Sequence, residues 1–215
     1  MNRREFVKGS LAIASAAAFN LGCAKEPAAV SDNAKNTTQE GAKKMDKKCM
    51  VIYYSWSGNT RFAAETIAKK TGADTFEIKA ETSYNSDFQK CCDEAQPECR
   101  GKTLRPIKAI EGLDVSKYDT VFVGSPNWWG TLAPPVRTWV TQNVAALKGK
   151  TVCLFQTHGG GGMQSLGRDF AALLPESKVL PPKAFSGSTI KSSVKALEEF
   201  ATGRIAANER ELKKT

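Results

Sequence analysis

The chain has 215 residues, of which 41% are hydrophobic, and this is enough for one mid-sized domain with a packed core. Its 31 Lys and Arg residues exceed its 22 Asp and Glu residues, which gives a formal net charge of +9. The excess is spread along the chain, without a basic helix or an aromatic RNA-binding signature, so the composition argues against a nucleic-acid-binding protein.

The first 23 residues predict an export signal peptide, because a basic start, NRREFVK, is followed by small apolar residues and then by NLGCA. Arg3 and Arg4 lie in a segment that resembles the twin-arginine export motif, whose pathway is known for carrying proteins already folded around a cofactor. The segment LGCA resembles a lipoprotein cleavage site, at which Cys23 would become the lipidated first residue. Ordinary signal cleavage nearby, a cytoplasmic amphipathic start and an uncleaved anchor are the alternatives, although the apolar run is short of the ~20 residues that a span needs.

Residues 24–48 contain almost no large apolar side chains, so this segment cannot bury enough surface to offset the entropy of ordering. We therefore expect a disordered linker there, a folded domain over residues 49–205 and a charged tail over residues 206–215. Together with the signal, this organisation predicts a periplasmic or otherwise extracytoplasmic protein, which a lipidated Cys23 would tether to the membrane.

Three strand-to-loop-to-helix units follow in the predicted domain. They begin at residues 49, 120 and 151, where the apolar runs CMVIYY, TVFVG and TVCLFQT are each followed by helical spacing. Two more strands and a closing helix are expected at residues 75–79, 177–185 and 193–205. Strands that alternate with helices predict an α/β fold with a parallel sheet, in which ligands bind at the carboxyl ends of the strands.

The first loop of these units, SWSGNT at residues 55–60, joins a buried strand to a helix start. Its hydroxyl groups, backbone N–H groups and positive helix end suit a dianionic phosphate, and Gly58 would let the backbone approach closely. The loop lacks the lysine of a nucleoside-triphosphate loop and the glycine pattern of a dinucleotide loop. The alternative is an ordinary helix cap, in which one Ser or Thr satisfies the first N–H groups of the helix.

The second and third loops carry aromatic residues and glycines. In GSPNWWGT, the adjacent Trp128 and Trp129 follow a strand, where aromatic side chains can stack on a flat heteroaromatic ring; core packing or an interface patch is the alternative. In THGGGG, residues 157–162, glycine lets backbone N–H groups press against a ligand edge; a mobile surface loop is the alternative. Three such loops on one sheet edge predict a site for a flat ring attached to a phosphate.

Three motifs, YSWSGNT, YDTVFVGSPNWWGTLAPPVRTW and THGGGG, closely resemble the flavin mononucleotide (FMN)-binding loops of the flavodoxin family, and the resemblance covers nearly all of residues 51–205. It implies a doubly wound, five-stranded parallel sheet in the order 2-1-3-4-5, with helices on both faces. It also implies FMN as the cofactor, with its phosphate on the first loop, its isoalloxazine against the second loop and the third loop closing the other side. The residues implied to bind FMN are Ser55, Trp56, Ser57, Gly58, Asn59, Thr60, Ser125, Pro126, Asn127, Trp128, Trp129, Gly130, Thr157, His158, Gly159, Gly160 and Gly161.

A bound cofactor of this kind would carry the chemistry, so no catalytic side chain is expected. Backbone groups of Trp129 and Gly130, and of residues 158–161, are the expected contacts to the polar edge of the flavin. His158, the only histidine, would stabilise negative charge on a reduced flavin if its imidazole were protonated. A solvent-exposed or backbone-bonded imidazole is the alternative.

The cysteines divide into two groups. Cys49 and Cys153 fall in predicted buried strands and are expected to be small core residues. Cys91, Cys92 and Cys99 lie in an inserted segment, where one disulfide could join Cys92 or Cys91 to Cys99. A helix would hold Cys92 and Cys99 about 10 Å apart at ~1.5 Å per residue, which opposes that disulfide. No metal site is expected, because three thiols without a fourth nearby ligand fall short of the usual set.

The sequence leaves three functions open. The first is an exported FMN protein that transfers electrons to or from a redox partner protein, and the basic domain favours a membrane-side or acidic partner. The second is an FMN-dependent reductase that uses NAD(P)H to reduce quinones or another small electron acceptor, since relatives that stack nicotinamide directly on the flavin need no separate nicotinamide motif. The third is a binding module without a cofactor.

Overall fold

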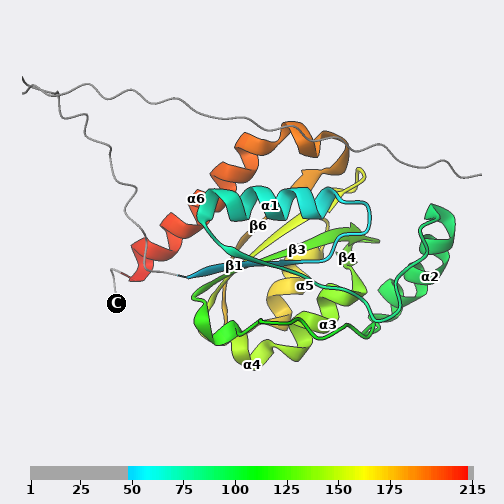
Figure 1. Ribbon diagram of the computed structural model, residues 1–215, viewed down its shortest axis with the longest axis horizontal. Helices are drawn as coiled ribbons and strands as arrows, with labels where there is room; N and C mark the ends of the chain where they lie inside the picture. The colour runs from blue at the N-terminus through cyan, green and yellow to red at the C-terminus, as the bar shows by residue number, and fades with distance from the viewer. Residues whose placement is uncertain (1–47, 213–215) are drawn as a thin grey trace, which may run out of the picture. The chain divides into compact units, whose positions relative to one another are not determined.

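The computed structural model describes residues 48–212, so the predicted export signal, Cys23 and the linker up to residue 47 lie outside the described residues. Five parallel strands form one sheet in the order β2-β1-β3-β5-β6 (Figure 1). They are β1 (Cys49–Tyr53), β2 (Asp74–Glu77), β3 (Thr120–Trp128), β5 (Thr151–His158) and β6 (Lys178–Ser186). Numbered along the chain, these parallel strands follow the order 2-1-3-4-5, which confirms the predicted fold class.

Helices cover both faces of the sheet (Figure 1). The helices α1 (Asn59–Thr71) and α6 (Val194–Leu212) pack on one face, and α3 (Pro134–Gln142), α4 (Val144–Leu147) and α5 (Leu166–Leu173) pack on the other. The remaining helical elements are α2 (Phe88–Gly101) and two short 3₁₀ helices, η1 (Val115–Lys117) and η2 (Gly187–Ser192). Among residues 48–212, no helix is both long enough and apolar enough to span a bilayer.

The first strand shows why the sheet forms where the apolar runs are. All five residues of β1 are buried. Met50 and Ile52 pack in the core that contains α3 and α5, whereas Val51 and Tyr53 pack in the core that contains α1 and α6. Because successive side chains of a strand point to opposite faces, a strand covered on both faces needs apolar residues at every position. The apolar run ends where the polar loop to α1 begins.

The last helix is longer than predicted. The sequence predicted a helix up to residue 205 and a charged tail from residue 206, but α6 continues to Leu212. Asn208 is buried in that continuation, where its side-chain oxygen accepts a hydrogen bond from Thr151 Oγ1 at 2.7 Å and its Nδ2 donates to Thr120 Oγ1 at 3.1 Å. The tail prediction was therefore wrong for residues 206–212, because Asn208 fastens this part of the chain to the starts of β3 and β5.

One short strand, β4 (Thr131–Leu132), was not predicted. It pairs with the end of β3 in an antiparallel sense, with Trp128 opposite Thr131, so Trp129 and Gly130 form the two-residue turn of a β-hairpin. Trp129 has a φ of 49° and Gly130 a φ of 78°, and type I′ hairpin turns have positive φ at both of these positions. The second predicted loop is thus an ordered hairpin at the carboxyl end of β3.

Candidate functional site

A cavity of about 590 Å³ opens at the carboxyl ends of β1, β3 and β5, where the three predicted loops meet. The predicted site residues in its lining are Trp56, Ser57, Asn59, Pro126, Asn127, Trp128, Trp129, Thr157, His158 and Gly159. The predicted residues outside its lining are Ser55, Gly58, Thr60, Ser125, Gly130, Gly160 and Gly161. The structure therefore brings the three loops to one site and separates residues that face the cavity from residues that support the loops.

In the first loop, some side chains face the cavity and others bond the protein. Ser57 and Asn59 line the cavity. Ser55 instead accepts a hydrogen bond from the Gly58 N–H through its Oγ at 3.1 Å, and the buried Thr60 hydroxyl bonds the Thr157 hydroxyl at 2.8 Å. Ser55 and Thr60 thus fix the loop, and Thr60 joins it to the third loop.

The start of α1 is open to a ligand. Gly58 occupies the N-cap position with a φ of 89°, and within the described chain no side chain makes a capping hydrogen bond to this helix start. The alternative of an ordinary Ser or Thr cap is thus not what the structure contains. The first N–H groups of a helix lack partners inside the helix and carry its partial positive charge, so this end can bind an anion.

The two adjacent tryptophans of the hairpin differ in their surroundings. The Trp128 ring packs edge-on against Tyr84, with ring centroids 4.9 Å apart, and against Tyr54 at 5.8 Å. Trp129 is 44% exposed and adopts the left-handed conformation described above. Positive φ is uncommon for a bulky side chain, and such conformations gather at functional sites. Trp128 is therefore a supported wall of the cavity, and Trp129 is an exposed part of its rim.

Polar side chains of β3 hold the hairpin in place through hydrogen bonds. Asn127 donates from Nδ2 to the carbonyl oxygen of Gly162 at 2.7 Å and accepts from the Gly130 N–H through Oδ1 at 2.8 Å. The buried Ser125 accepts from the Ala133 N–H at 3.0 Å. Asn127 therefore occupies the Gly130 N–H and ties the hairpin to the third loop, and the expected ligand contact through backbone groups of Gly130 stays a prediction.

The third loop contains the only histidine of the chain. His158 accepts a hydrogen bond at Nδ1 from the Gly160 N–H at 3.1 Å, so this imidazole is bonded to the backbone of its own loop. A Cβ at Gly161 would lie 3.0 Å from Gln164 Nε2, so a side chain there would push against the end of Gln164. The Gly160 N–H is engaged and cannot serve as the expected ligand contact while this bond persists.

Two parts of the lining were not predicted from the sequence. One is the wall formed by α2, which contributes Phe88, Cys91, Cys92 and Ala95. The other is the segment after β6, which contributes Gly187 and Ser188; a Cβ at Gly187 would lie 2.6 Å from Asn59 Nδ2. The small polar residues after β6 were a usable signal, because they follow a strand of the parallel sheet. The sequence offered no comparable sign that α2 lies over the cavity.

The cysteines of α2 are not bridged. Cys92 and Cys99 are not joined in the structure, and the predicted disulfide was wrong for a geometric reason. Seven residues of helix rise about 10 Å, whereas the Cα atoms of a disulfide lie within about 7 Å. Burial raises the pKa of the Cys91 thiol to about 11 and that of Cys99 to about 12. The prediction that Cys49 and Cys153 are buried is confirmed.

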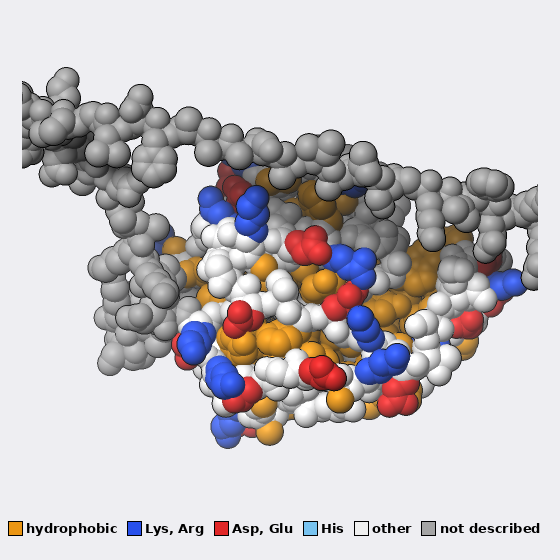
Figure 2. Space-filling view, viewed as in Figure 1, with side chains coloured by type: hydrophobic (Ala, Val, Ile, Leu, Met, Phe, Trp, Pro, Cys, Tyr) orange, Lys and Arg blue, Asp and Glu red, His pale blue; other side chains and the backbone are white. Residues whose placement is uncertain are grey.

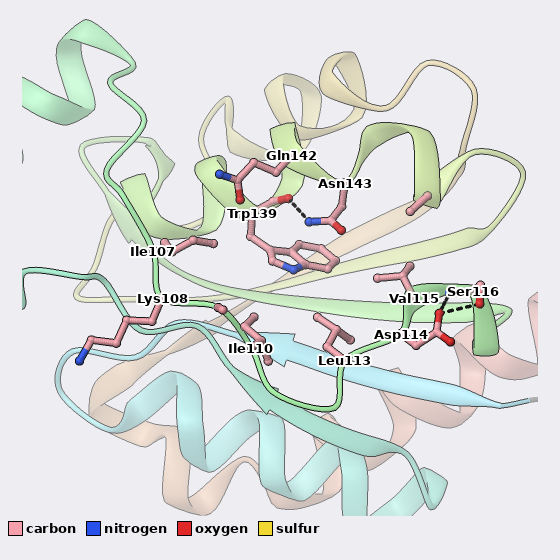
Figure 3. Close-up of a pocket in the computed structure, with 12 residues that line it drawn as sticks. Ile107, Lys108, Ile110, Leu113, Asp114, Val115, Ser116, Trp139, Gln142 and Asn143 are labelled. Carbon is pink, nitrogen blue, oxygen red and sulfur yellow. Dashed lines mark hydrogen bonds between the residues drawn. The ribbon is translucent and has the colours of Figure 1, made fainter.

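A second cavity, of about 450 Å³, lies between α3 and the chain segment that leads to η1 (Figure 3). Its walls include Ile110, Leu113 and Trp139, and Figure 3 shows these side chains pointing toward one another across it. Asp114 at its edge accepts hydrogen bonds from the backbone N–H and hydroxyl of Ser116 at 3.1 and 2.6 Å. No residue of the three predicted loops lines this cavity, so it is separate from the candidate site.

The candidate site has two chemically different ends. We call Ser57, Asn59 and Ser188, at the start of α1, the polar end, and Phe88, Trp128 and Trp129 the aromatic end. Within the described residues, the lining contains no Asp, Glu, Lys or Arg. Ligand cavities of about 300–1,000 Å³ with apolar walls and a few placed polar groups are typical small-molecule sites. The arrangement fits a flat ring at one end and an anion at the other.

Comparisons with known proteins agree with this arrangement. A family model described as Flavodoxin matches residues 48–200. A crystal structure of a flavoprotein from Lactobacillus acidophilus NCFM in complex with FMN is 28% identical, covers 68% of this chain and 97% of its own, and has a TM-score of 0.57. The apo-form of a flavoprotein from the same organism is 29% identical, with coverages of 65% and 93% and a TM-score of 0.53. A protein from Bacteroides eggerthii DSM 20697 is 25% identical, with coverages of 70% and 97% and a TM-score of 0.58.

Proposed function

Because the chain belongs to the flavodoxin family, we propose that it binds FMN and transfers electrons to or from a redox partner. The observation that carries this proposal is the pairing, in one cavity, of a helix start without a side-chain cap and a wall of aromatic rings. FMN has the matching parts, a phosphate and a flat ring system. When bound, FMN supplies the redox chemistry, and the protein supplies binding, orientation and the local electric field.

The residues of the cavity fit FMN. Ser57 and Asn59, with the first N–H groups of α1, would hold the phosphate, and Ser188 would extend the same polar end. Trp128 and Trp129 would lie against the ring system and exclude water from it. Gly187 supports this fit, because a side chain there would enter the space of Asn59.

The chemistry of the lining favours an electron carrier. His158 carries the only imidazole of the described lining, and its Nδ1 already accepts a hydrogen bond from the Gly160 N–H. Phe88 is 69% exposed and, with Trp129, places apolar surface at the rim of the cavity. Exposed aromatic residues are enriched where proteins contact one another. A partner docked on this rim would reach the flavin edge.

A second function, reduction of quinones or another small acceptor with NAD(P)H, is favoured by the same rim. Phe88 and Trp129 could stack a planar molecule as well as contact a protein. Steady-state turnover with NADH or NADPH separates the two functions. Rapid turnover with a quinone would favour the reductase, and reduction by dithionite alone would favour the carrier.

We also propose that the protein is exported and works outside the cytoplasm, tethered through Cys23 if that residue is lipidated. The support is the sequence of the first 23 residues. An acidic or membrane-side partner remains our proposal from the net charge of +9. On the face seen in Figure 2, side chains of both signs are interspersed, with hydrophobic side chains exposed between them. Replacement of Arg3 and Arg4 by lysine should leave the protein in the cytoplasmic fraction; unchanged export would contradict a twin-arginine route.

The first test of the proposed function is a visible absorption spectrum of the purified protein after addition of FMN and removal of unbound ligand. A retained flavin spectrum that dithionite bleaches supports the proposal. A folded, colourless protein that does not retain FMN would contradict it and would favour the binding module without a cofactor. Addition of NADH and NADPH before dithionite tests the reductase in the same sample.

A further inference from the structure

A buried arginine bonds the hairpin of the candidate site. Arg137, in α3, is only 8% exposed, and its Nη2 donates a hydrogen bond to the hydroxyl of Thr131. Its Nε is buried and has no hydrogen-bond partner within the described residues. Thr131 pairs with Trp128, which lines the cavity. Because paired residues of an antiparallel hairpin project their side chains to the same face, the guanidinium group lies on the face of the hairpin that carries the Trp128 ring.

The charge of Arg137 is poorly compensated. Among the described side chains, no Asp or Glu forms an ion pair with it; Asp169 in α5 acts on it without pairing, and Asp169 itself bonds Arg168 and Ser165. Burial lowers the pKa of Arg137, but an arginine stays protonated at neutral pH. A buried charge without a partner normally costs stability, so stability does not account for the burial of Arg137 next to a ligand cavity.

The sequence had pointed to another cation. His158 was the candidate for a positive charge beside the flavin, but its Nδ1 accepts from the Gly160 N–H. The segment PPVRTWV gives no sign that its fourth residue, Arg137, is buried. The described lining contains no Lys or Arg. Two cations reach the aromatic end through one intervening residue: Arg105, which stacks on Tyr84 and is paired with Glu98, and Arg137, which bonds Thr131 and has no paired carboxylate.

We propose that Arg137 is an electrostatic positioning and tuning residue that raises the midpoint potential of the bound flavin. This inference rests on the proposed function, because it requires FMN in the cavity. Two-electron reduction of FMN takes up two electrons and, when N1 stays unprotonated, one proton, so the ring gains one negative charge. A fixed cation in a region of low dielectric stabilises that charged state more than the neutral oxidised ring.

The test compares the midpoint potential of bound FMN in the wild type and in Arg137→Met. We expect little change in the affinity for oxidised FMN and a loss of about tenfold in the relative affinity for reduced FMN. For a two-electron couple, that tenfold change lowers the midpoint potential by about 30 mV. Arg137→Lys, which keeps a positive charge, should restore most of the potential.

Arg204 provides a matched control. Its Nε is also buried without a partner, but it lies in α6 over the ring of Phe200, and no residue of α6 lines the cavity. Arg204→Met should leave the potential unchanged. An equal shift in Arg204→Met would overturn the proposal, because the effect would then follow from net charge and not from position.

Melting of the apoprotein separates the electrostatic role of Arg137 from a structural role. Replacing an uncompensated buried charge by an apolar side chain of similar length is often neutral or stabilising, so the Arg137→Met apoprotein should melt no lower than the wild type. If Arg137→Met does not fold, Arg137→Gln retains a donor for Thr131 without the charge and should show the same lowered potential. Bound FMN with an unchanged potential in the folded variant would overturn the inference, whereas failure of the wild type to bind FMN would overturn the proposed function itself.

Discussion

The polar and aromatic ends of the cavity are built in different ways. The polar end comes mainly from one short stretch of chain, in which Ser57 and Asn59 are positioned by the turn at Gly58 and the start of α1. The aromatic end is assembled from the hairpin and α2, and it is held by contacts between distant residues, such as the Asn127 bond to Gly162. The anion site therefore depends on local geometry, whereas the ring site depends on tertiary packing.

The largest expected effect is a loss of FMN affinity on a change at Asn59, which tests the polar end separately from the aromatic end. Asn59→Asp places a carboxylate at the start of α1, where it would repel a phosphate dianion. We expect the affinity for FMN to fall about 100-fold, which is about 2.8 kcal/mol. The same carboxylate should stabilise the apoprotein by about 0.3–1 kcal/mol, because it complements the positive end of the helix. Fluorescence titration measures the affinity, and thermal melting measures the stability.

Riboflavin is the control ligand for this change, because it has the ring system without the phosphate. Its affinity should be nearly unaffected by Asn59→Asp. Equal losses for FMN and riboflavin would show that the polar end does not bind the phosphate.

Trp128→Ala changes the aromatic end, and it should affect stability and the two ligands in a pattern opposite to that of Asn59→Asp. Loss of the ring that packs on Tyr84 and Tyr54 should destabilise the apoprotein by about 2–3 kcal/mol and weaken FMN and riboflavin alike. Phe88→Ala is the matched control, because an exposed ring on the same cavity should change stability by no more than about 0.5 kcal/mol. Denaturant unfolding of both apoproteins checks this, and equal stability losses would contradict the supporting role of Trp128.

A smaller effect is expected at Trp129, where the backbone has positive φ. The Trp129→Gly apoprotein should be more stable than the Trp129→Ala apoprotein by about 1 kcal/mol, because only glycine adopts this conformation without steric cost. Both variants remove the indole, so their difference isolates the backbone. If Ala proved the more stable residue, the positive φ of the turn would be in doubt.

The smallest expected effects concern the thiols of α2. Burial raises the pKa of Cys91 and Cys99 to about 11 and about 12, from an ordinary value of 9.0, so both should remain protonated and react slowly with iodoacetamide at pH 8. Cys92 is only partly buried and should react first, and FMN should slow that reaction because Cys92 lines the cavity. Mass spectrometry of partly alkylated protein gives the order, and equal rates at all three thiols would oppose it.

The same pKa shifts give a direction for alkaline unfolding. The protonated thiols are favoured in the folded state, so their contribution to stability is fully present below pH 9 and is lost as the pH rises toward 11 and 12. Cys99→Ala should make the fall in the free energy of unfolding between pH 9 and 11 shallower. An unchanged slope would assign the alkaline loss to other groups.

Much of the fold could be predicted because its signals are local. The apolar run of β1 is buried on both faces, and Gly72 ends α1 with a φ of 67°, which glycine adopts without steric cost. The end of α6 could not be predicted in the same way. Asn208 is polar in the sequence, and only its pairing with Thr120 and Thr151 makes burial favourable.

The candidate site was predictable to the extent that loops at strand ends define it. Ser57, Trp128 and Thr157 line one cavity, as the three loops indicated. The sequence could not separate them from supporting residues such as Ser125 and Thr60, because that difference depends on which way each side chain points after folding. The wall formed by α2 was missed for a related reason, since the position of an inserted helix depends on tertiary contacts.

In the proposed site, one cavity holds a flat ring and a phosphate at its two ends. The most direct test is a pair of titrations of the wild-type apoprotein, one with FMN and one with riboflavin, followed by flavin fluorescence. The account predicts saturable binding of both ligands, with FMN bound at least about 100-fold more tightly, a difference of about 2.8 kcal/mol. Equal affinities would contradict a phosphate site at the start of α1, and no binding of either ligand would contradict the account as a whole.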